Sequence, residues 1–217
     1  MNSPPTTRQL LLDTGIELAA SKGLRGITVR EVAASANVNL GSFVYHFGNR
    51  QAFIEELVEL WYAPMFAQLR VTAQGGPTSA DDSASSAHTR LQATLLQLLS
   101  FIGQNAAFIR HMMMDAMAGE AAARKFLGDL PGRHPKLILA LVMQAQQEGC
   151  LMAGNPLQMM IFVMMACGVP LLVASGMPGE WLAPQVQMLK ALMADPQAAR
   201  QRLQWALKGL ATEKGFT

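Results

Sequence analysis

The side chains that most often perform catalysis are few in this chain, and they are scattered along it. His111 and Asp115 stand four residues apart and can share one face of a helix, but two ligands do not make a metal site. Cys150 and Cys167 are expected to be small buried hydrophobic residues and not a redox pair. No phosphate-binding glycine loop with lysine, no H-E-x-x-H and no nucleophile elbow occurs. We therefore expect no enzymatic activity, no metal and no cofactor.

Composition indicates a folded, hydrophobic protein. The chain has 217 residues, of which 51% are hydrophobic and 15% charged, and its net charge is only +2. This balance excludes intrinsic disorder as the overall state, and it excludes binding driven by a strongly charged surface. Fifteen methionines are many, and methionine suits either an adaptable core or a surface that accepts varied ligands.

The segment from Val29 to Asn49 has the pattern of two short helices joined by a tight turn. Thr28 and Glu31 form a capping box at its start, and Asn37 stands where the turn needs a left-handed backbone. Small or apolar residues fill the expected inward positions: Val32, Ala33, Ala36, Val38, Phe43 and Phe47. This is helix-turn-helix spacing, in which the second helix is free to enter the major groove of DNA.

The same segment resembles the DNA-binding region of the TetR family of bacterial regulators. The resemblance covers about residues 8–62 and rests on these residues: Thr28, Val32, Ala33, Ala36, Val38, Gly41, Phe43, Tyr45, His46, Phe47 and Arg50. Three positions depart from the usual family pattern. Asn37 replaces the turn glycine, Val44 replaces an aromatic residue, and Arg50 replaces a lysine.

The resemblance implies a set of DNA contacts around the second helix. Gly41 would allow close backbone approach, Leu40 can touch a thymine methyl group, and Arg50 would hold a phosphate. The full expected set is Thr28, Arg30, Asn39, Leu40, Gly41, Ser42, Tyr45, His46 and Arg50. Residues 1–50 carry five basic and three acidic side chains, and this small excess predicts modest non-specific affinity and a need for two half-sites.

Nearly every other segment also reads as helix, so the expected fold is all-α. The resemblance implies a DNA-binding domain at 6–66, with its motif at about 29–48, followed by a helical effector-binding and dimerisation domain at 67–217. Residues 73–87 are small, polar and acidic, and they predict a flexible stretch. Helices are expected at about 6–22, 28–36, 39–46, 49–70, 88–103, 105–118, 119–128, 134–148, 156–176, 181–194 and 196–212.

The resemblance assigns ligand binding and dimerisation to the C-terminal part. An apolar pocket is expected from Trp61, Met65, Phe101, Phe108, His111, Met114, Met143 and Met164. A dimer interface is expected along 156–176 and 196–212, with Val163, Cys167, Leu171, Leu203 and Leu207 at its core. Pro64 should kink the helix at 49–70 beside the pocket, and ligand binding there would change the separation of the DNA-reading heads.

The expected function is that of a cytoplasmic, ligand-responsive repressor that binds a palindromic operator as a homodimer and is released by an apolar or amphipathic molecule. Residues 149–179 carry no charge, and 159–175 reach the short limit for spanning a bilayer. Pro170 and Gly168 lie inside this run, no lysine or arginine flanks it closely, and no signal peptide is evident. A membrane-associated helical protein, or a DNA-binding regulator without a ligand, remains the alternative.

Overall fold

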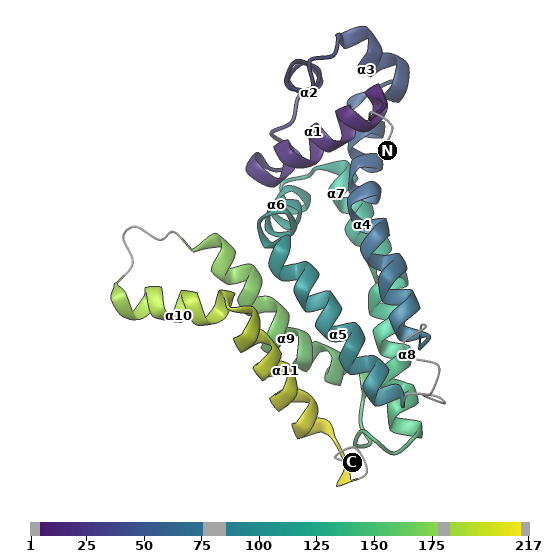
Figure 1. The fold of residues 1–217 in the computed structure, drawn as a ribbon, viewed down its shortest axis with the longest axis vertical. Helices are drawn as coiled ribbons and strands as arrows, with labels where there is room; N and C mark the ends of the chain where they lie inside the picture. Colours follow the sequence, from purple (N-terminus) through teal and green to yellow (C-terminus); the bar gives the residue numbers. More distant parts are fainter. Residues whose placement is uncertain (1–4, 76–85, 178–182, 214–217) are drawn as a thin grey trace. The chain divides into compact units, whose positions relative to one another are not determined.

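The computed structural model describes residues 5–75, 86–177 and 183–213, and Figure 1 shows that these residues form helices linked by short connections. Their order is α1 (Thr7–Lys22), α2 (Val29–Ser35), α3 (Leu40–Phe47), α4 (Arg50–Ala73), α5 (Ala87–Gln104), α6 (Ala106–Met117), α7 (Ala121–Asp129), the 3-10 turn η1 (Leu130–Gly132), α8 (His134–Gln147), α9 (Pro156–Gly176), α10 (Pro184–Ala194) and α11 (Pro196–Leu210). Each expected helix is present within a few residues of its expected bounds, which confirms the all-α fold. Most of the expected flexible stretch, at 76–85, lies outside the described residues.

The chain divides into two compact units. Unit 1 contains the chain up to Pro64 together with Ala107–Leu130, and unit 2 contains Met65–Ala106 and the chain from Pro131 onward. The expected boundary at residue 66 therefore differs from the structural division, because α6 and α7 pack with the N-terminal helices instead of with the C-terminal ones. Helix α4 begins in unit 1 and ends in unit 2, and the division falls at its internal proline, Pro64.

Local capping positions the helices of unit 1. The Thr28 hydroxyl accepts a hydrogen bond from the Glu31 amide at 3.2 Å, as the capping-box pattern predicts. Asn37 adopts a positive φ of 53° in the turn between α2 and α3, as expected. Beneath α3, the rings of Phe43, Phe47 and Phe53 pack with centroids 4.9 to 5.3 Å apart. This aromatic core holds α3 against the start of α4.

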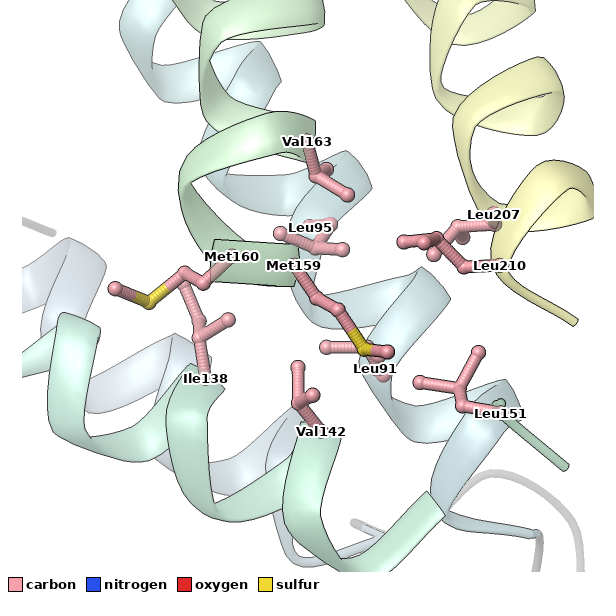
Figure 2. A pocket seen from close by; sticks show the side chains of 10 residues that line it. All are labelled: Leu91, Leu95, Ile138, Val142, Leu151, Met159, Met160, Val163, Leu207 and Leu210. Carbon is pink, nitrogen blue, oxygen red and sulfur yellow. The ribbon is translucent and has the colours of Figure 1, made fainter. Parts of the chain in front are cut away.

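Unit 2 is a bundle in which α9 packs against α5, α8, α10 and α11. Figure 2 shows side chains from α5, α8, α9 and α11 converging, among them Leu95, Val142, Met159 and Leu207. The cavity left among them is only about 10 Å³, which is close to the minimum that holds one water molecule. This part of unit 2 is therefore a filled hydrophobic core.

Helix α9 has two different apolar faces. Val163, Cys167 and Leu171 on α9 are buried within unit 2, as are Leu203 and Leu207 on α11. This corrects the expectation that these five side chains form the core of a dimer interface, because their own subunit already covers them. The opposite face of α9 leaves its apolar side chains exposed: Leu157, Ile161, Phe162, Met165 and Val173. Among the described helices, α9 is the one long and apolar enough to cross a membrane, and 33% of its most apolar stretch is buried.

Candidate nucleic-acid interface

Helix α3 turns one face into the core of unit 1 and the other toward solvent. Phe43 and Phe47 are buried, whereas Leu40 is 44% exposed, Val44 52% and Tyr45 84%. Gly41 lies between them on the exposed side. An eight-residue helix held from below by aromatic rings can enter a major groove without disturbing the core that supports it.

The N-terminal end of α3 is fixed by its own cap. The Asn39 side-chain oxygen accepts a hydrogen bond from the Ser42 amide at 2.8 Å, so Asn39 orients the helix that it precedes. A Cβ atom at Gly41 would meet only this capping oxygen, at 3.2 Å, and otherwise open space. The Gly41 backbone can therefore approach DNA closely, as the sequence predicts. The Ser42 hydroxyl is not used by this cap, which employs only the Ser42 amide.

Val44 is a solvent-facing residue that the expected contact set omitted. It lies one turn after Leu40 on the same exposed side of α3. The signal was present in the sequence, since an apolar residue at this spacing on the outer face has no core to fill. The usual family pattern has an aromatic residue here, so in the sequence the valine is seen as a lost contact and not as a contact of its own.

Arg50, expected at a phosphate, is held within unit 1. Its guanidinium donates to the Leu24 carbonyl at 2.6 Å, to the Ile27 carbonyl at 2.9 Å and to the Glu120 carboxylate at 3.1 Å. Glu120, the N-cap residue of α7, is buried, whereas the Arg50 side chain remains partly exposed. Arg50 therefore joins α7 to the loop between α1 and α2, and any phosphate would compete with these bonds. Its phosphate contact stays a prediction.

Asp115 on α6 also holds the loop between α1 and α2. Its carboxylate accepts from the Leu24 amide at 2.6 Å and from the Arg25 amide at 3.3 Å. A Cβ at Gly23 would come within 2.7 Å of the same carboxylate, which explains why a glycine stands there. Sequence reasoning missed this role because the partners are about ninety positions apart and only the folded chain brings them together.

The remaining expected contacts lie around α2 and α3 of unit 1. Thr28 and Arg30 are exposed at the start of α2, and the Thr28 hydroxyl, which accepts from Glu31, can still donate to a phosphate. The Tyr45 and His46 rings meet edge to face with centroids 5.1 Å apart. Each of these side chains is accessible for DNA contact, and each contact stays a prediction.

The eight residues expected in a ligand pocket divide between the units. Trp61, Phe108, His111 and Met114 belong to unit 1, and Met65, Phe101, Met143 and Met164 belong to unit 2. In unit 1 the Trp61 and Phe108 rings pack at 4.3 Å, so they tie α4 to α6. None of the eight lines the filled core of Figure 2 or the groove described next. Their pocket role stays a prediction.

A groove of about 210 Å³ opens in unit 2. Its walls come from α5, α9, α11 and the end of α10: Leu96, Leu99, Ser100, Gly103, Gln104, Leu171, Ala194, Pro196, Ala199 and Arg200. It exceeds the ~150 Å³ of an engineered apolar cavity that binds benzene. The lining is mostly apolar, with Ser100, Gln104 and Arg200 as polar groups, which is the usual make-up of a small-molecule site.

Helix α3 is capped and exposed, aromatic rings support it, and a left-handed turn joins it to α2. These features define a helix-turn-helix DNA-binding protein.

Comparison with known proteins gives the family. Residues 11–57 match the model for bacterial regulatory proteins of the tetR family. The repressor NemR of Escherichia coli (strain K12) is 27% identical over 157 residues, which span 70% of this chain and 75% of NemR. Residues 11–57 thus form a DNA-binding region of the TetR family of transcriptional regulators.

Two solved structures share the fold. That of the ketosteroid transcriptional regulator KstR2 of Mycobacterium tuberculosis has a TM-score of 0.67 at 20% identity and covers 97% of this chain and 98% of its own. A SmeT–triclosan complex has a TM-score of 0.68 at 17% identity and covers 97% of this chain and 94% of its own. At these identities the likeness extends to the fold alone.

Proposed function

We propose that this chain is a cytoplasmic repressor that binds a palindromic operator as a homodimer and is released from it by a small apolar or amphipathic molecule. The observation that carries the proposal is the exposed face of α3, with Leu40, Gly41 and Val44 presented on a helix whose other face is anchored in unit 1. Such a helix fits a major groove, and a two-fold dimer places two of them on the half-sites of a palindrome.

The exposed face of α9 and its neighbours supports the homodimer. Helix α10 buries none of its residues, although Met188, Leu189 and Leu192 are apolar and exposed. Trp205 on α11 is 65% exposed. Helices α9, α10 and α11 of unit 2 thus all expose large apolar side chains, and monomeric soluble proteins rarely leave such side chains grouped in water. A second copy of the chain would cover it through a two-fold contact.

The groove between α5, α9 and α11 supports the effector. Its apolar walls suit a hydrocarbon or aromatic body, and the exposed Arg200 in its lining suits an anionic or polar group. Two similar structures support a small-molecule effector, since one is a SmeT–triclosan complex and the other is the ketosteroid transcriptional regulator KstR2. The regulators of this comparison are not enzymes, and the proposal includes no catalysis.

A mobility-shift experiment tests the proposal. The probe is the duplex DNA that flanks the protein's own gene, with an unrelated duplex of equal length as competitor. We expect a complex that survives the competitor and that is lost in Gly41→Trp, because a large side chain there blocks close approach. Gly128→Trp on the open surface of α7, away from the proposed dimer surface, is the matched control and should bind as wild type. Equal retention of both duplexes by the wild-type protein would overturn the proposal.

A further inference from the structure

The exposed face of α3 presents two aliphatic side chains, Leu40 and Val44, beside the polar groups of Ser42, Tyr45 and His46. The helix reads Leu-Gly-Ser-Phe-Val-Tyr-His-Phe and contains no arginine, lysine, asparagine or glutamine. Those four residue types make the bidentate contacts that read guanine and adenine. The one amide nearby, Asn39, already uses its side-chain oxygen to cap the helix at Ser42. Leu40 and Val44 lie one turn apart and are both about half exposed, so they are the aliphatic side chains that α3 can present to base edges.

Only one base edge in the major groove offers an apolar group. Thymine carries a C5 methyl there, whereas the other three bases present hydrogen-bond donors or acceptors. Four residues of helix rise about 6 Å, and successive base pairs are about 3.4 Å apart, so Leu40 and Val44 can meet methyl groups one or two steps apart. Placing these side chains over a guanine or cytosine edge would desolvate polar atoms without replacing their hydrogen bonds.

We propose that Leu40 and Val44 determine operator specificity by packing against thymine methyl groups, two in each half-site. The inference rests on the proposed function, since it requires operator binding through α3. It goes further in naming the base and the atom that are read. Sequence choice then depends on hydrophobic contact at these positions, and Ser42 or Tyr45 add hydrogen bonds at neighbouring ones.

Thymine-to-uracil exchange tests the methyl contact directly. Deoxyuridine keeps every hydrogen-bonding group of thymidine and lacks only the C5 methyl. The probe is the duplex that wild-type protein enriches from a random-sequence library, with each thymine of a half-site replaced in turn. Burying one methyl is worth about 0.8 kcal/mol, so we expect about a fourfold loss of affinity at two positions per half-site and none elsewhere.

Two variants assign the methyl groups to side chains. Val44→Ala should lose affinity for the thymine duplex and become insensitive to uracil at one position, and Leu40→Ala should do so at the other. Val71→Ala is the matched control, because Val71 is exposed to a similar degree on α4 but lies in unit 2. It should keep the full uracil effect.

The outcomes separate this inference from the proposed function. Strong enrichment of one sequence together with no uracil effect at any thymine would overturn the methyl contact and leave operator binding intact. A lack of any enrichment would overturn both. The uracil scan uses the wild-type protein alone, so the test stands even where Leu40→Ala or Val44→Ala fails to fold.

Discussion

Single side chains in unit 1 carry structural bonds that the DNA-contact interpretation did not predict. Arg50 is the clearest case, because its guanidinium satisfies two carbonyls and a buried carboxylate at once. Removing it would leave Glu120 as a buried charge without its partner, which is far more costly than the loss of an exposed ion pair. The residue can therefore matter for DNA binding without touching a phosphate.

Arg50→Ala is expected to lower the free energy of unfolding by about 2–3 kcal/mol, since the partly exposed guanidinium reduces the full cost of a buried pair. Arg50→Lys should recover only part of this, because an ammonium cannot reproduce the forked donors. Denaturant titration measures both, with exposed Arg30→Ala as control. Unchanged stability in Arg50→Ala, combined with a shallower salt dependence of DNA binding, would show a phosphate contact instead.

His134, at the start of α8, makes unit 2 sensitive to acid. Burial, assisted by the neighbouring Arg133 charge, lowers the pKa of His134 to about 4 from its ordinary value near 6.5. The unfolded chain therefore binds a proton that the folded chain does not, and stability falls as the pH drops from about 6.5 toward 4. The loss approaches about 3 kcal/mol at pH 4.

His134→Gln should remove this part of the pH dependence, because glutamine does not titrate in the range. Urea denaturation of both proteins at pH 7 and pH 4.5 measures the difference. The gap between the two pH values should be smaller in the variant than in the wild type. Equal pH dependence in the two proteins would show that His134 is protonated in the folded state as well.

At the scale of elements, helix positions were predictable and helix partners were not. Caps such as Thr28 and Asn155, each followed by apolar residues at helical spacing, act within a few residues and are visible in the sequence. The grouping of α6 and α7 with the N-terminal helices depends on bonds such as Asp115 to Leu24, which no local pattern encodes. The predicted interface residues of α9 lie on its inner face, and because α9 is apolar all round, the sequence could not distinguish that face from the outer one.

Asp115 on α6 should position the helix-turn-helix. Asp115→Ala leaves the Leu24 and Arg25 amides without their acceptor, and we expect a loss of about 1–3 kcal/mol of stability together with weaker operator binding. Asp129→Ala, which removes an exposed carboxylate from α7, is the control. Asp115→Asn should bind better than Asp115→Ala, since the amide oxygen can still accept. Wild-type operator affinity in Asp115→Ala would rule out the positioning role.

At the scale of the whole molecule, substitutions on the outer and inner faces of α9 distinguish a dimer contact from a core contact. Phe162→Glu on the exposed face should give folded monomers and reduced operator binding, because the new carboxylate stays in water in the monomer and would be buried only in the dimer. Val163→Glu on the buried face should instead unfold unit 2. Sedimentation velocity and circular dichroism distinguish the two results. A Phe162→Glu protein that remains dimeric would place the interface elsewhere.

The central claim is that two copies of α3 read an inverted repeat. Sequencing the DNA that wild-type protein retains from a random library tests it most directly. We predict an inverted repeat whose half-sites are thymine-rich where α3 lies and whose centres are separated by a whole number of helical turns of about 10–10.5 base pairs. Enrichment of a single asymmetric site, or of no sequence at all, would contradict the account.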